Sequence, residues 1–216
     1  MDKIDKEIIS SNSLKYLGKG RIPDDEGIAG AVSECVDMLD EEAHFRVCRE
    51  IYSLTQKDGF FHIPELSVTL ESEDTNIYFE GCDRICVILS TLGIETERFI
   101  RKIQMMDMAK GMILDTCAGA FLERMTDMEE SDLGDRTFRV CPGYGDLSLG
   151  LNEIFLRAIN GTKRIGVTLT ESGLFVPQKS MLGLIGLGRN NTNRSCGRCV
   201  RKARCTFLAE GIRCWN

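Results

Sequence analysis

Several features that would point to a function are absent or scarce in this sequence of 216 residues. No apolar run approaches the roughly 20 residues that a helix needs to cross a bilayer, so we do not expect a membrane protein. The chain has only two histidines, His44 and His62, and no Ser-His-Asp triad can be proposed from them. It also lacks a Walker motif and a Gly-x-Gly-x-x-Gly motif at the start of a helix. The charged run Met1–Glu7 does not resemble the apolar core of a secretion signal, and we expect a cytoplasmic protein.

The net charge of −6 hides an uneven distribution of charged residues. Residues 1–136 contain 15 basic and 29 acidic residues, whereas residues 137–216 contain 12 basic and 4 acidic residues. A basic face that meets an anion or an acidic partner would explain this difference. Attraction between the two parts within one fold would explain it equally well.

The ten cysteines are predicted to be free thiols or metal ligands, because we expect the chain to stay in a reducing compartment. Four of them stand close together near the C-terminal end and are considered below. The other six lie in or beside apolar segments and are each predicted to be a small buried hydrophobic residue: Cys35, Cys48, Cys82, Cys86, Cys117 and Cys141.

Hydrophobic periodicity predicts a mixture of helices and strands. Helices are expected at residues 28–39, 96–128 and 147–159, and the second of these is one long central helix. Strands are expected at residues 44–54, 60–70, 85–92, 137–141, 165–169 and 180–187, with the first two forming a hairpin. Because strands and helices do not alternate strictly, the sequence favours an α+β fold over a doubly wound sheet. The Met105–Met108 patch is interpreted as flexible core filling, and a patch that faces a cofactor is the alternative.

Two segments combine residue types that are suited to ligand binding. In the first segment, a predicted strand carries Arg139 and is followed by Cys141, Pro142, Gly143 and Tyr144. An arginine can hold a carboxylate through two parallel hydrogen bonds, and a glycine lets a ligand approach the main chain closely. A tight turn with a packed tyrosine is the structural alternative.

The second segment is a predicted strand that runs into the polar corner Thr170–Ser172, which contains Glu171. Binding residues commonly lie in the loops that follow strands. A capped turn explains the same residues equally well when this segment is considered alone.

Together, the two segments resemble the reactivation domain of cobalamin-dependent methionine synthase, and the whole chain resembles free-standing small proteins of that family. The resemblance covers about residues 137–188, so we expect an activation-domain-like part at residues 1–188 and a Cys-rich basic tail at residues 189–216. The matching positions are Arg139, Pro142, Gly143, Tyr144, Ile165, Gly166, Leu169, Thr170, Glu171, Ser172, Pro177, Ser180 and Gly183.

The resemblance implies a C-shaped α+β body with a mixed or antiparallel sheet that binds S-adenosylmethionine in a shallow groove. It implies docking on the cobalamin-binding module of methionine synthase or another corrinoid protein. There, an electron donor such as flavodoxin or ferredoxin reduces oxidised cobalamin, which S-adenosylmethionine then remethylates. By position, Arg139 would hold the ligand carboxylate, and the backbone at Cys141 and Gly143 would line the adenosyl group. Tyr144 would lie beside that group, and Glu171 and Ser172 would shape the groove floor.

This sequence departs from the family pattern on the strand after Ser180. The family has bulky aromatic residues there, next to the ligand, and this chain has Leu184, Ile185 and Gly186. A docking or scaffolding homologue that has lost the ligand is therefore an alternative function.

Four cysteines near the C-terminal end have spacing typical of a metal site: Cys196, Cys199, Cys205 and Cys214. Four thiolates in so short a stretch can bind a tetrahedral zinc ion or an iron–sulfur cluster. Interleaved cations would offset the charge of the thiolates: Arg194, Arg198, Arg201, Lys202, Arg204 and Arg213. Spacing does not separate zinc from iron–sulfur, and a metal-free tail with oxidisable thiols is the third possibility.

A zinc-knuckle module that contacts nucleic acid is a further alternative function, because basic residues around a zinc site are typical of such modules. The tail offers only Phe207 and Trp215 for base stacking, and the rest of the chain is acidic. We therefore do not expect a nucleic-acid partner.

Overall fold

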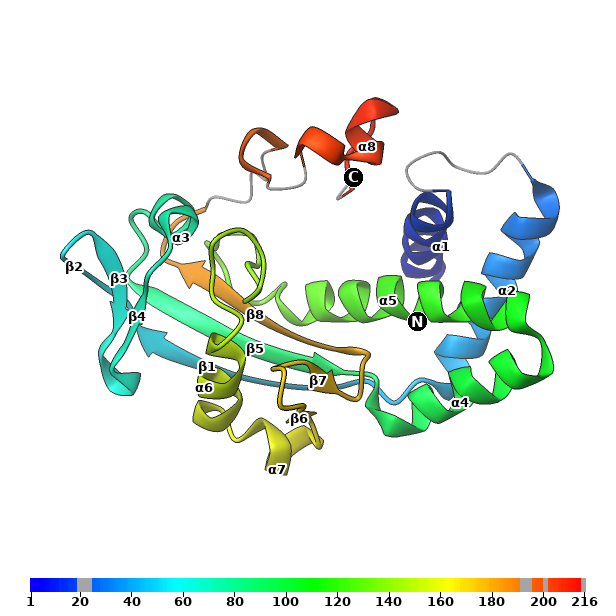
Figure 1. Ribbon diagram of the computed structural model, residues 1–216, viewed down its shortest axis with the longest axis horizontal. Helices are drawn as coiled ribbons and strands as arrows, with labels where there is room; N and C mark the ends of the chain where they lie inside the picture. The colour runs from blue at the N-terminus through cyan, green and yellow to red at the C-terminus, as the bar shows by residue number, and fades with distance from the viewer. Residues whose placement is uncertain (19–24, 191–195, 200–201, 215–216) are drawn as a thin grey trace. The chain divides into compact units, whose positions relative to one another are not determined.

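The computed structural model describes residues 1–18, 25–190, 196–199 and 202–214 (Figure 1). Three residues of the predicted tail motif, Arg194, Arg201 and Trp215, lie outside these ranges. The described part of the chain contains helices and small antiparallel sheets, so the predicted α+β class is confirmed. None of its helices combines the length and the apolar character needed to cross a membrane.

The chain divides into two compact units. We call Arg46–Thr91 with Glu129–Ser195 the sheet unit, and Met1–Phe45 with Leu92–Met128 and Cys196–Asn216 the helical unit. Both predicted ligand-binding segments belong to the sheet unit, whereas the four tail cysteines belong to the helical unit.

The sheet unit is built on β5, which spans Arg84–Thr91 (Figure 1). β5 lies between β1 (Arg46–Ser53) and β8 (Ser180–Leu187) and is antiparallel to both. Every residue of β5 except Arg84 is buried, which explains why its sequence is a continuous apolar run. The predicted strands at residues 85–92 and 180–187 are therefore confirmed.

Helices and a hairpin cover one face of this sheet (Figure 1). They are α3 (Glu73–Tyr78), α6 (Leu151–Ala158), α7 (Gly161–Ile165) and the hairpin of β6 (Thr168–Leu169) and β7 (Phe175–Val176). Phe155 and Leu156 of α6 join Val87, Leu89 and Leu184 of the sheet in one buried cluster. The opposite face of the sheet buries a smaller cluster: Cys86, Ile88, Ile185 and Leu187.

The predicted hairpin of residues 44–54 with 60–70 is wrong. β1 pairs with β5, and a separate sheet forms from β2 (Thr55–Lys57), β3 (Phe60–Ile63) and β4 (Val68–Leu70). Pro64, which begins a short 3₁₀ turn, ends β3 because proline has no N–H group to donate to a strand ladder.

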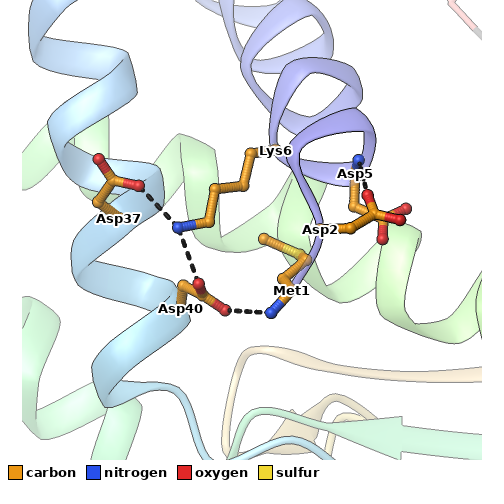
Figure 2. A network of polar contacts seen from close by, with 6 residues as sticks. All are labelled: Met1, Asp2, Asp5, Lys6, Asp37 and Asp40. Atoms are coloured by element: carbon orange, nitrogen blue, oxygen red, sulfur yellow. Dashed lines mark hydrogen bonds and ion pairs between the residues drawn. The ribbon is translucent and has the colours of Figure 1, made fainter.

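The helical unit contains α1 (Lys3–Leu17), α2 (Glu26–Glu42), α4 (Gly93–Met106) and α5 (Met108–Glu129). α2 confirms the predicted helix at 28–39, and Asp25 caps it by accepting hydrogen bonds from two backbone amides. α1 and α2 pack together, and Lys6 reaches from α1 to Asp37 and Asp40 of α2, 2.8 Å from each (Figure 2).

The predicted long central helix is wrong as a single element, because it breaks at Asp107 into α4 and α5. Asp107 has extended backbone angles, and its Oδ1 accepts a hydrogen bond from the Lys110 amide at 3.0 Å. An aspartate that bonds the amide three residues later starts a new helix. The core-filling interpretation of the adjacent methionines is also wrong, since Met105, Met106 and Met108 are 86%, 75% and 64% exposed.

Candidate functional site

Arg139 is held alongside β8 by backbone pairing on both sides of it. Thr137 donates to the Gly186 carbonyl at 2.9 Å, and Val140 exchanges two hydrogen bonds with Leu184 at 2.9 and 2.8 Å. The side chain of Arg139 then crosses Gly183, where any Cβ atom would collide with its Cγ and Cδ atoms. Gly183 therefore leaves the space that the arginine occupies.

The guanidinium of Arg139 forms a buried ion pair with Glu130, through Nη1 and Oε1. The side chains are only 2% and 8% exposed, so each charge depends on the other for compensation. Sequence reasoning missed Glu130, which directly follows α5 and stands nine positions before the arginine. No spacing rule for helices or strands connects the two residues, so the pair is visible only in the folded chain.

The glycine segment after Arg139 forms a compact turn. The Tyr144 amide donates to the Cys141 carbonyl at 3.2 Å, and the Gly143 amide donates to the Leu147 carbonyl at 2.8 Å. Gly143 has a φ of +88°, which favours glycine. Tyr144 is 69% exposed, so its ring is at the surface of the sheet unit. The tight turn of the structural alternative is therefore present, but its tyrosine is exposed and not packed.

Asp146 anchors this turn to α3. Its carboxylate accepts hydrogen bonds from the Ser72 hydroxyl at 2.5 Å and from the Glu73 amide at 2.6 Å. Desolvation raises the pKa of Asp146, but the hydrogen bonds from Ser72, Glu73 and Asp74 outweigh that effect and hold the pKa below its ordinary value.

The second segment forms the turn of the β6–β7 hairpin. The Thr170 amide donates to the Leu174 carbonyl at 2.9 Å, and the Thr170 hydroxyl bonds to the Ser172 hydroxyl at 2.9 Å. The amide group of Asn152, a buried residue of α6, donates to the Gly173 carbonyl at 3.3 Å and ties this turn to the helix.

A groove of about 690 Å³ opens between α6 and this turn. We call it the α6 groove, and its lining residues are Leu149, Gly150, Glu153, Leu156, Arg157, Thr162, Leu169, Thr170, Glu171, Ser172 and Gly173. It therefore brings the predicted Glu171 and Ser172 together with residues of α6 that the sequence analysis did not select. Glu153 and Arg157 form an exposed ion pair on its wall, 2.6 Å apart.

The four predicted residues of the first segment, Arg139, Cys141, Gly143 and Tyr144, do not line the α6 groove. Leu149 connects the two segments. A Cβ atom on Gly143 would lie 2.9 Å from one methyl group of Leu149, and a Cβ atom on Gly173 would lie 3.6 Å from the other. The glycine turn and the hairpin turn thus meet across a single side chain.

The four tail cysteines belong to the helical unit. Partial burial raises the pKa of Cys214, and the nearby thiols of Cys205, Cys199 and Cys196 raise it further. The tail packs on α1, where the rings of Tyr16 and Phe207 meet edge to face with centroids 5.7 Å apart. Within the described ranges, no group of three or more His, Cys, Asp or Glu side chains is arranged to hold a metal ion. The tail metal site therefore stays a prediction from spacing.

No protein-family model matches the chain, and no curated protein matches its sequence. Among solved structures, the chain is similar to the MetH reactivation domain bound to AdoHcy. The TM-score is 0.60 at 12% sequence identity, and the match covers 88% of this chain and 74% of that chain. A structural similarity at this identity shows a shared fold and does not extend to the ligand or partner. This chain therefore has the fold of the MetH reactivation domain.

Proposed function

We propose that this protein binds S-adenosylmethionine and acts as an activation protein for a corrinoid methyltransferase such as methionine synthase. The observation that carries the proposal is a fold shared, over most of the chain, with a domain whose solved structure is bound to AdoHcy. The α6 groove also supports the proposal, because it contains Glu171 and Ser172, the two residues that the resemblance assigns to the groove floor.

The α6 groove fits an adenosyl ligand in size and in chemistry. Its volume of about 690 Å³ is typical of small-molecule sites, which enclose roughly 300–1,000 Å³. Leu149, Leu156 and Leu169 offer apolar surface for a flat base, and Thr170 and Ser172 offer hydroxyl groups. We propose that the adenosyl group lies in this groove, with the backbone at Cys141 and Gly143 and the ring of Tyr144 beside it.

The amino-acid end of the ligand is assigned to Arg139, as the resemblance implies. In the structure this guanidinium is paired with Glu130, so the assignment requires the ligand carboxylate to replace or join that partner. S-adenosylmethionine supplies the transferable methyl group and leaves as S-adenosylhomocysteine, while the protein supplies orientation and exclusion of water.

A methyl-transfer experiment tests this function. Methyl-labelled S-adenosylmethionine is mixed with a cobalamin-bearing methionine synthase module and a chemical reductant, with and without this protein. The proposal predicts label on the cobalamin, and S-adenosylhomocysteine in equal amount, only when this protein is present. Equal labelling in its absence contradicts the proposal.

A docking homologue without ligand is the second candidate function. Two observations favour it: Arg139 already has a buried partner, and Leu184 and Ile185 are completely buried in the core. This candidate predicts that the protein binds the cobalamin-bearing module and that neither S-adenosylmethionine nor AdoHcy changes its melting temperature.

The cysteine tail is proposed to bind one zinc ion or one iron–sulfur cluster. The support is the spacing of Cys196, Cys199, Cys205 and Cys214 in the sequence. An iron–sulfur cluster would suit a protein whose partner must receive an electron, whereas zinc would make the tail structural.

A further inference from the structure

Arg139 already has a carboxylate partner inside the sheet unit. Its side chain and that of Glu130 are 2% and 8% exposed, so water does little to screen either charge. A ligand carboxylate that approaches the same guanidinium meets this resident negative charge. Resting on the proposed function, we propose that Glu130 competes with the carboxylate of the ligand for Arg139 and thereby sets the affinity of the site.

The surrounding contacts identify Glu130 as the partner that moves. Arg139 is held between backbone hydrogen bonds to β8, and its stem fills the space over Gly183. Glu130, by contrast, lies in the turn that follows α5, outside regular structure. The exchange of carboxylates is therefore a movement of the Glu130 side chain, and Arg139 stays in position.

The turn that carries Glu130 is itself anchored. Arg49 on β1 donates to the Glu129 carbonyl at 2.5 Å, and forms an ion pair with Asp132 at 2.6 Å. These contacts flank Glu130 on both sides along the chain. They hold its backbone close to Arg139, so the competing carboxylate is present at a high local concentration whenever the site is empty.

Replacing Glu130 with glutamine removes the competing charge and keeps the size of the side chain. We expect Glu130→Gln to bind AdoHcy about tenfold more tightly than the wild-type protein, a change of about 1.4 kcal/mol. Adenosine, which has no carboxylate, should bind both proteins equally. The matched control is Glu129→Gln, which removes the same charge one position away on an exposed residue and should leave both affinities unchanged.

Titration calorimetry with AdoHcy and with adenosine tests the competition. Tighter AdoHcy binding by Glu130→Gln, with adenosine unchanged, supports it, as does AdoHcy binding by this variant alone. If the wild-type protein binds AdoHcy and Glu130→Gln binds it equally tightly or more weakly, the competition is overturned while the proposed function stands. Absence of AdoHcy binding in every protein overturns both. If Glu130→Gln does not fold, Glu130→Asp, which withdraws the carboxylate by one methylene group, should give an intermediate affinity. Unchanged affinity in Glu130→Asp would overturn the competition.

Discussion

Gly183 of β8 lies directly against the side chain of Arg139, in the space that a Cβ atom would fill. The two residues belong to motifs that are far apart in the sequence, one on the segment before the glycine turn and one on the last strand of the sheet. Their contact shows that the segment of Arg139 packs directly on β8 at Gly183. It also explains why the strand carries a glycine at a fully buried position.

Gly183→Ala should destabilise the protein. The added methyl group collides with Cγ and Cδ of Arg139, and overpacking of this kind costs about 1–3 kcal/mol in the free energy of unfolding. Urea unfolding measures the change. The control is Gly119→Ala in α5, where a Cβ atom meets nothing within 4 Å. That substitution should stabilise the protein by about 0.5–1 kcal/mol. Equal stability of wild type and Gly183→Ala would contradict the packing arrangement.

Leu149→Ala should weaken ligand binding more than it weakens the fold. Leu149 is 38% exposed, so its removal costs the free protein less buried area than the removal of a fully buried core leucine would. In the proposed complex it forms the wall between the glycine turn and the hairpin turn, and we expect AdoHcy to bind Leu149→Ala about tenfold more weakly than the wild-type protein. Leu174→Ala is the matched control, because Leu174 is exposed on the same hairpin and does not line the groove. Similar losses in both variants would place the ligand elsewhere.

Acid should weaken the attachment of the glycine turn to α3. The folded-state pKa of Asp146 lies below its ordinary value. Its carboxylate therefore contributes to the free energy of unfolding in full above the unfolded-state pKa, and this contribution is lost as the pH falls through the folded-state pKa. Asp146→Asn should lower the free energy of unfolding at pH 7 by about 1 kcal/mol. The difference from wild type should shrink as the pH falls and the Asp146 carboxylate becomes protonated. A difference that does not change between pH 7 and pH 2.5 would show that the charge of Asp146 is not involved.

Protein purified without oxygen should contain one zinc ion or one iron–sulfur cluster per chain. Elemental analysis and the visible absorption spectrum separate the two metals. Replacement of Cys196, Cys199, Cys205 and Cys214 by serine should abolish the metal, whereas Cys48→Ala, at a buried position in the sheet unit, should retain it. If the purified protein contains no stoichiometric metal, the predicted metal site is wrong and the tail cysteines are oxidisable free thiols.

The strongest elements of the fold could be predicted from the sequence because each has a local signal. β5 and β8 are apolar runs of strand length, and the start of α2 is fixed by the capping side chain of Asp25. The sequence also predicts the polar corner that contains Glu171 at the end of a strand, and the turn after β6 confirms it, since local hydrogen bonds form such turns.

Two kinds of feature could not be predicted: those in which one local signal outweighs another, and those that depend on contacts between residues far apart in the sequence. The periodicity from residue 96 to 128 does continue through Asp107, but the local capping bond of that aspartate outweighs helix continuation. Glu130 gives no signal in the sequence, because its partner is brought to it only by the pairing of the Arg139 segment with β8. The α6 groove likewise joins residues of a helix and a hairpin that no motif connects.

Titration calorimetry of the wild-type protein with AdoHcy is the most direct test of ligand binding. We expect saturable binding of one AdoHcy per chain, with a higher melting temperature at saturation. We also expect that Ser172→Ala, a change in the α6 groove, lowers the affinity while the unliganded melting temperature stays the same. A flat titration together with an unchanged melting temperature would contradict ligand binding and leave this chain as a protein that shares only the fold.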